Sequence, residues 1–225
     1  MSKVFFAAVL AVLTALAAGH SPLELNASQT AVGVAYAIPE PLEARAAYAE
    51  LGGNGDGVHY YFFNASAGEE LFAELLVPAL PECENSAPLL ALIGPGLPVQ
   101  AVPHLNIPAG NGVAVFSYSG ALPGNKFFEA WTQSTYFKRQ TFKVNAPATG
   151  TYYLAVAGKK GDCRKYVLIV GERERVTGWD LVTFPRHWLD VKLFFNDFVS
   201  VGAAWIVFLV ILLFAGCWVC GWLSS

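Results

Sequence analysis

The chain has 225 residues, of which 55% are hydrophobic, and a formal net charge of −3 at pH 7. This composition is too apolar for an average soluble domain and too poor in apolar residues for a protein with several membrane spans. The slightly acidic balance and the lack of a basic cluster argue against nucleic acid as a partner.

Residues 1–19 have the features of a signal peptide. Lys3 precedes an apolar run over residues 4–18, and small residues allow cleavage after Ala17 or after Gly19. A basic start, a short apolar run and small residues at the cut are typical of secretory signals. We expect the domain that follows to lie on the extracytoplasmic side of a cell membrane. A second membrane anchor is the alternative, although the run is short for one.

Cleavage after Gly19 would leave His20 at the mature N-terminus. A terminal histidine offers both its amino group and its ring to a metal, and such nitrogen ligands suit Cu(II). His59 and His104 could complete the site. A copper-binding surface protein is therefore the alternative function. The simpler interpretation is a frayed terminus and two unrelated histidines.

Residues 20–178 are expected to form an all-β domain. Short β-prone runs alternate with turn clusters rich in Gly, Pro and Asn, a pattern typical of a β-sandwich or jelly roll. The runs cover residues 58–63, 71–77, 89–93, 113–118, 137–144, 151–157 and 165–170. The sequence therefore predicts a jelly-roll-like β-sandwich ectodomain.

Two cysteines and two glycosylation motifs lie in this domain. Cys83 and Cys163 both occur in polar, turn-like segments, and we expect a disulfide between them in an oxidising compartment. Two free thiols are the alternative. Asn26 and Asn64 each begin an Asn-Ala-Ser motif, which makes them glycosylation acceptors in a eukaryotic source and ordinary turn residues otherwise.

The stretch over residues 127–140 holds the densest mixture of aromatic and polar side chains. Trp131 and Tyr136 could stack on a sugar or on a partner's side chain, with Glu129, Gln133 and Arg139 as hydrogen-bonding groups. We take these five as the candidate site for a ligand or partner. The alternative is a pair of strands with core aromatics and a buried Arg–Glu bridge.

Motifs of enzymes are absent from the sequence. It contains neither G-x-S-x-G nor H-E-x-x-H, and it lacks the lysine of a phosphate-binding loop. We therefore expect no enzymatic activity, no catalytic residues and, apart from the copper alternative, no cofactor. Residues 54–57 resemble the start of a calcium loop but lack its remaining ligands, which predicts a tight turn.

The C-terminal part predicts a juxtamembrane segment over residues 179–200 and a transmembrane helix over residues 201–223. Trp188, Val191 and Phe195 recur at helical spacing, which indicates an amphipathic helix at the lipid interface or, alternatively, one packed on the sandwich. Residues 201–223 carry no charge and are long enough to cross a bilayer. The polar spacer of a GPI-anchor signal is missing.

Residues 60–71, 140–156 and 166–170 resemble the strands of the bacterial pre-peptidase C-terminal domain. That resemblance implies a small jelly-roll-like β-sandwich with a non-catalytic role in targeting, matrix binding or stability. This chain departs from the family because it has no peptidase and because the family pattern does not explain residues 78–139.

The expected function is therefore that of a single-pass membrane protein. Its non-catalytic domain would bind something or support a complex at the membrane or cell surface. The expected partners are the membrane and another membrane or surface protein or a glycan.

Overall fold

The computed structural model describes residues 21–23, 30–175 and 178–223. Side chains are described throughout these ranges except at residues 21, 22, 179, 181, 211 and 214–223. The predicted signal peptide over residues 1–19 lies outside the described residues, as do His20 and Asn26.

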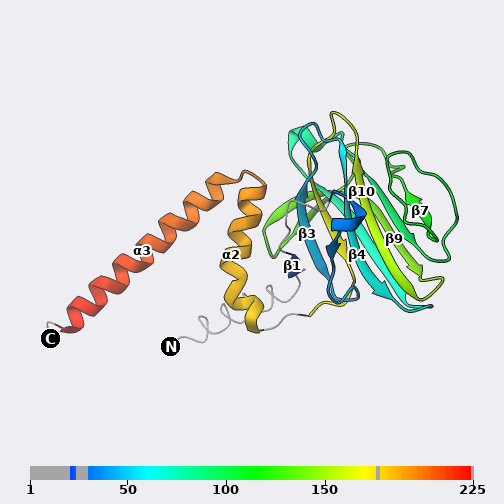
Figure 1. The fold of residues 1–225 in the computed structure, drawn as a ribbon. Coiled ribbons are helices and arrows are strands. Elements are labelled where there is room, and N and C mark those ends of the chain that lie inside the picture. The colour runs from blue at the N-terminus through cyan, green and yellow to red at the C-terminus, as the bar shows by residue number, and fades with distance from the viewer. Residues whose placement is uncertain (1–20, 24–29, 176–177, 224–225) are drawn as a thin grey trace.

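Two β-sheets make up the body of the molecule (Figure 1). The six-stranded sheet has the order β1-β3-β11-β5-β9-β8, and the five-stranded sheet has the order β2-β4-β10-β6-β7. The strands of the six-stranded sheet are β1 (Ser21–Leu23), β3 (Arg45–Glu50), β11 (Lys165–Val170), β5 (Glu70–Pro78), β9 (Ser134–Asn145) and β8 (Lys126–Glu129). Those of the five-stranded sheet are β2 (Tyr36–Ala37), β4 (Gly57–Ala65), β10 (Gly150–Gly158), β6 (Leu89–Gly94) and β7 (Gly112–Phe116).

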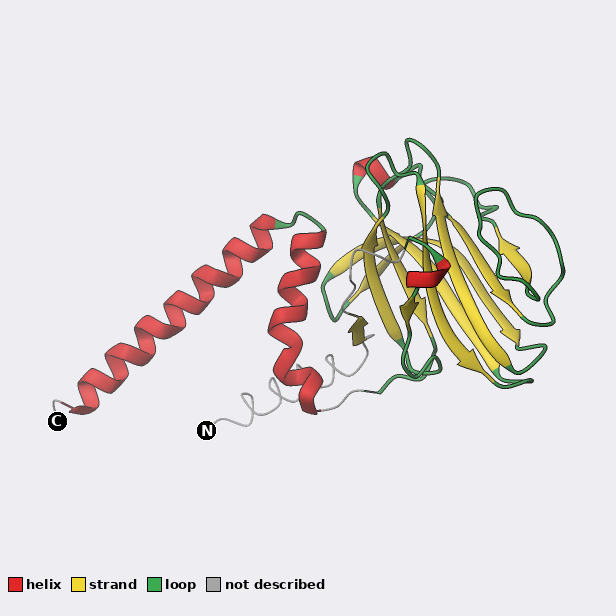
Figure 2. Cartoon of the chain, viewed as in Figure 1, coloured by secondary structure: helices red, strands yellow, loops and turns green. Residues whose placement is uncertain are grey.

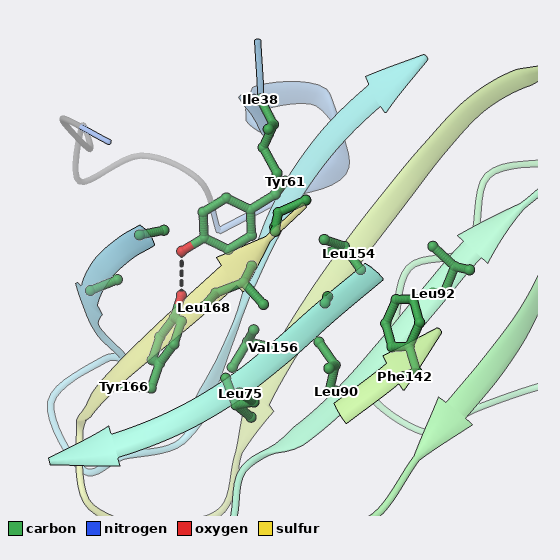
Figure 3. Packing of buried hydrophobic residues seen from close by; sticks show 14 of the residues in the cluster. Ile38, Tyr61, Leu75, Leu90, Leu92, Phe142, Leu154, Val156, Tyr166 and Leu168 are labelled. Carbon is green, nitrogen blue, oxygen red and sulfur yellow. Dashed lines mark hydrogen bonds between the residues drawn. The ribbon is translucent and has the colours of Figure 1, made fainter. Parts of the chain in front are cut away.

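Alternation along the strands builds the core between the two sheets. Because successive side chains of a strand point to opposite faces, every second residue of β5 and β11 meets β6 and β10 of the other sheet. Leu75 and Leu168 from the first sheet pack with Leu90 and Leu154 from the second, all with no exposed surface (Figure 3). This packing confirms the predicted β-sandwich.

Each of the seven predicted runs falls on a strand, in order β4, β5, β6, β7, β9, β10 and β11, although the run over residues 113–118 extends two residues past the end of β7. The sequence analysis missed β1, β2, β3 and β8. Three of these are short, and β3 reads Arg-Ala-Ala-Tyr-Ala-Glu, in which alanine gives a weak β signal. Nevertheless, β3 pairs with β11 over its whole length and has β1 as its parallel neighbour.

The disulfide between Cys83 and Cys163 is formed, with 4.8 Å between the Cα atoms, which confirms that prediction. Cys83 belongs to the short 3-10 helix η2 (Pro81–Cys83), which follows β5, and Cys163 lies between β10 and β11. The bond therefore fixes the start of the segment over residues 78–139 to the loop between β10 and β11.

Each sheet has a second apolar face that other parts of the chain cover. A further 3-10 helix, η1 (Val32–Val34), and the loop over residues 97–111 cover the five-stranded sheet, where Leu105 and Ile107 pack against Tyr60 and Ile93. The helix α2 (Gly178–Phe194) lies beside the six-stranded sheet (Figure 1). The molecule is thus layered, with the loop on one side of the sandwich and α2 on the other.

A second helix, α3 (Phe198–Leu223), follows α2 after a short elbow and extends away from the sandwich (Figure 2). Asn196 takes the left-handed conformation that ends many helices (φ 57°), and the N–H of Asp197 donates to the carbonyl of Lys192. The side chain of Asp197 then accepts hydrogen bonds from the N–H and hydroxyl of Ser200 and caps the start of α3.

The predicted transmembrane helix is not confirmed. Residues 201–223 do form a helix, as part of α3. Within the described part of the chain, however, no helix combines the length and the hydropathy needed to cross a membrane. The side chains of residue 211 and of residues 214–223 lie outside that part.

Candidate functional site

The candidate site is the outer face of the six-stranded sheet, where α2 binds. Alternation in the strands turns one set of side chains away from the core and toward the helix. We call this set the docking face; it comprises Ala46 and Tyr48 of β3, Leu76 of β5, Tyr136 of β9, and Val167 and Ile169 of β11. Val191 and Phe195 of the helical segment are buried against it. The docking face is therefore a binding site whose occupant belongs to the same chain.

Three aromatic pairs join the helical segment to the sheet. Tyr136 meets Phe195 with ring centres 5.1 Å apart, and Tyr48 meets Phe194 at 5.5 Å. Trp131, in the turn between β8 and β9, meets Phe184 at 4.7 Å. All three pairs are edge-to-face, the arrangement in which the positive ring edge meets the negative ring face.

A polar cluster lies at the edge of the docking face. The hydroxyls of Tyr48 and Tyr136 are 3.3 Å apart. The carboxylate of Glu129 accepts hydrogen bonds from the N–H groups of Trp131 and Thr132, each at 2.8 Å, and from the Thr132 hydroxyl. These bonds fix the turn that presents Trp131 to α2.

The tyrosine hydroxyls of this cluster stay protonated over the physiological range. Burial raises the pKa of Tyr136 to about 12. Burial, followed by the proximity of Tyr136, raises the pKa of Tyr48 well above its ordinary value. Both groups are therefore neutral hydrogen-bonding partners beneath the helix.

Two lysines hold the C-terminal end of α2. The buried Lys192 donates from Nζ to the carbonyl of Gln133 at 2.7 Å and pairs with Asp197 at 3.2 Å. Lys165 of β11 donates from Nζ to the carbonyl of Phe194 at 2.5 Å. Cations at this end of a helix also interact favourably with its dipole. Hydrogen bonds from Ser200, together with Lys192, lower the pKa of Asp197, so its carboxylate stays charged.

The predicted ligand site is only partly brought together. Trp131 and Tyr136 are buried, with 7% and 1% of their surfaces exposed, and Glu129 lies beside them. Trp131 contacts Phe184 of α2 and Tyr136 contacts Phe195 just after it, whereas Glu129 binds the turn that contains Trp131 and Thr132. Gln133 is exposed and takes part through its main-chain carbonyl. This arrangement corresponds to the alternative of buried aromatics.

Arg139 is separate from the other four residues. It is buried and donates to the carbonyls of Ser86 at 2.6 Å, Pro123 at 2.7 Å and Glu84 at 3.1 Å. The alternative interpretation expected a buried salt bridge between an arginine and a glutamate. The guanidinium of Arg139 instead binds main-chain oxygens. Arg139 holds the loops before β6 and β8 against β9.

Of the three histidines of the copper hypothesis, the two that the structure describes, His59 and His104, lie in different surroundings. His59 is buried between the sheets, with Nδ1 2.8 Å from the hydroxyl of Tyr166, and His104 is exposed on the loop over residues 97–111. In the described ranges, no three His, Cys, Asp or Glu side chains are grouped to hold a metal. His20 lies outside those ranges, so its role stays a prediction.

Asn64, the described glycosylation candidate, is exposed on β4. Its side-chain oxygen accepts a hydrogen bond from the hydroxyl of Thr151 at 2.9 Å. The position is accessible, and its glycosylation stays a prediction.

The sequence analysis missed Tyr48 and the role of Lys192. Tyr48 was overlooked because β3 was not identified, which left its direction unassigned. Lys192 was not singled out because a lysine in an amphipathic helix is normally exposed, whereas this one is 4% exposed. The helical spacing of Val191 and Phe195 did indicate a buried face, but it did not identify what covers that face.

These features define the class of this molecule as a β-sandwich domain with a helix docked on one sheet. No protein-family model and no curated protein matches the chain. The resemblance to the pre-peptidase C-terminal domain therefore stays a prediction.

Among solved structures, the chain is similar to the mercury-soaked secreted protein MopE of Methylococcus capsulatus, in which an oxidised tryptophan facilitates copper binding. The two share 11% identity with a TM-score of 0.31, and the match covers 69% of this chain and 100% of the MopE chain. A likeness at this level assigns no property to this chain.

Proposed function

We propose that this chain is a single-pass membrane protein that holds a non-catalytic, jelly-roll-like β-sandwich in a fixed position on the extracytoplasmic side. Residues 1–19 would direct the domain across the membrane, and residues 201–223 would anchor it. Its partner would be another membrane or surface protein or a glycan. The disulfide between Cys83 and Cys163 supports an extracytoplasmic position, because such bonds persist in oxidising compartments.

The observation that carries this proposal is the docking of α2. Three aromatic pairs and two lysines bind α2 and the residue after it to the sandwich, and α3 begins after an elbow of three residues, 195–197. A domain displayed on a flexible stalk would need none of these contacts. The docked helix instead couples the orientation of the sandwich to that of α3.

The exposed surface of α3 supports its role as the anchor. Its described apolar side chains from Trp205 to Leu213 are each 43–69% exposed. Because consecutive residues point to different sides of a helix, this part of α3 is exposed and apolar on every side. A helix that is apolar all round needs an apolar environment all round. A bilayer supplies that environment.

The proposal is tested by extraction of the full chain from membranes. We expect the protein to stay in the membrane fraction after alkaline carbonate treatment. The double variant Leu209→Arg and Leu212→Arg should be released, because charge within an apolar span is costly. The matched variant Leu209→Ala and Leu212→Ala should be retained. Release of the unaltered protein would contradict anchoring.

The side of the membrane is tested separately. Lys159 and Lys160 are exposed between β10 and β11, on the body of the sandwich. A membrane-impermeant amine reagent added to intact cells or spheroplasts should modify both lysines. Modification only after the membrane is broken would place the domain on the opposite side.

A further inference from the structure

The helix α2 is apolar on two opposite faces. Phe184 and Val191 lie on the face that meets the sandwich. Val182 and Leu193 are 66% and 43% exposed, and Leu189 is half-buried. At about 100° per residue, Leu189 and Leu193 fall within about 20° of Val182, whereas Phe184 and Val191 fall about 180–200° away from it. We call Val182, Leu189 and Leu193 the outer stripe.

The outer stripe has no function in the docking of α2. The sandwich already covers the opposite face, and a single-sided amphipathic helix would carry polar residues where the outer stripe lies. Apolar exposure continues beyond the elbow, since Phe198 and Val199 at the start of α3 are 64% and 84% exposed. The apolar surface of α3 thus follows the outer stripe after the three-residue elbow.

We infer that the outer stripe rests on the phospholipid surface beside α3, so that α2 lies between the bilayer and the six-stranded sheet. This inference rests on the proposed anchoring by α3. From the sequence, the face of Val191 and Phe195 was expected either at the lipid interface or packed on the sandwich. The structure assigns that face to the sandwich and leaves the opposite one for lipid.

Two features favour lipid as the occupant of the outer stripe. The first is position: α2 and α3 meet at the elbow, and α2 lies between α3 and the sandwich (Figure 2). An anchored α3 would therefore bring bilayer next to the outer side of α2.

The second feature is Arg186, which is exposed and lies between Val182 and Leu189 on the same side of the helix. An arginine there can keep its stem on apolar surface while its guanidinium reaches a phosphate headgroup.

The inference is tested with spin labels on the full chain in nanodiscs of phosphatidylcholine and phosphatidylglycerol. Cys217→Ser and Cys220→Ser remove the cysteines outside the disulfide, and single cysteines are then placed at Val182 and Leu193. Labels at both positions should collide more often with oxygen, which concentrates in lipid, than with a water-soluble nickel chelate. Leu213→Cys serves as the anchor control and Val99→Cys, 92% exposed on the sandwich, as the water control.

The control positions separate the two proposals. If labels at Val182 and Leu193 respond like Val99 while Leu213 responds as lipid-embedded, the inference is wrong and the anchor stands. If Leu213 also responds as water-exposed, both are wrong. If the two stripe labels are shielded from both reagents and broaden one another between molecules, a second copy of the chain covers the stripe, which also overturns the inference.

Discussion

The side chain of His59 ends a row of hydrogen bonds inside the sandwich. Its Nδ1 is 2.8 Å from the hydroxyl of Tyr166, which in turn is 2.6 Å from the hydroxyl of Tyr61 (Figure 3). Burial lowers the pKa of His59 and raises the pKa of Tyr166 well above its ordinary value. The neutral imidazole and the protonated phenol are thus the forms that the fold favours.

This arrangement predicts a loss of stability under mildly acidic conditions. The pKa of His59 is lower in the folded chain than in the unfolded chain, where it is about 6.5. Between the two values the unfolded chain binds more protons, so the free energy of unfolding falls as the pH drops below about 6.5 and levels off below the folded-state pKa. His59→Asn, which cannot titrate, should flatten this dependence in denaturation of the full chain in detergent.

The exposed His104 provides the matched control for His59. His104→Asn should leave the pH dependence unchanged, because this side chain is exposed on a loop and asparagine also accepts the positive φ of 69° at this position. An unchanged slope in His59→Asn would show that other groups cause the acid sensitivity.

At the scale of single elements, α2 is held mainly by the aromatic residues at its end. Phe195 is 9% exposed and meets Tyr136 edge-to-face. Phe195→Ala removes the buried ring, a change that typically costs about 3–5 kcal/mol. Because α2 contacts only one side of the sandwich, we expect the loss to appear as local opening of α2 and not as global unfolding.

Hydrogen exchange of the full chain in detergent tests this prediction. Amides of α2 should exchange much faster in Phe195→Ala, while those of β5, β10 and β11 keep their protection. Leu193→Ala, on the outer stripe two residues away, should leave the docking of α2 intact in detergent. Equal protection of α2 in both variants would mean that Phe195 does not hold the helix.

The sequence predicted the long strands because each supplies enough alternation or apolar length to be recognised alone. It failed at β3, whose alanines acquire their strand conformation from pairing with β11. It also misplaced the boundary between the two helices, since the predicted boundary between residues 200 and 201 lies inside α3, which begins at Phe198. Local pattern cannot indicate pairing between distant segments.

The candidate site was only half predictable for the same reason. The stretch over residues 127–140 was recognised as a place where aromatic and polar groups gather, and two of its aromatic residues, Trp131 and Tyr136, pack against the helical segment. Its occupant, α2, lies about fifty residues further along the chain, and no local spacing reveals that contact. The partners of Arg139 are main-chain carbonyls, whose positions depend on the path of the chain and not on residue type.

On the scale of the whole molecule, the disulfide links two loops at one end of the sandwich, where β5 ends beside the start of its antiparallel neighbour β11. Cys83 and Cys163 are separated by 80 residues, and both are buried. The bond ties η2 to the loop between β10 and β11. Arg139 binds the same region through the carbonyls of Cys83, Glu84 and Ser86. The segment after β5 is therefore held by one covalent contact and one set of hydrogen bonds.

Loss of this bond should lower the stability of the whole sandwich. A cross-link over a loop of this length restricts the unfolded chain and contributes roughly 4 kcal/mol, so Cys83→Ser with Cys163→Ser should shift the denaturation midpoint strongly downward. Arg139 still holds η2 in that variant, so we expect the variant to fold.

Cys217→Ser with Cys220→Ser is the matched control, because those cysteines belong to α3, away from the sandwich. This control variant should unfold at the original midpoint. Reductant should reproduce the shift in the original chain and leave the Cys83→Ser, Cys163→Ser variant unaffected. A midpoint that responds to neither the substitution nor the reductant would show that the sandwich does not depend on the bond.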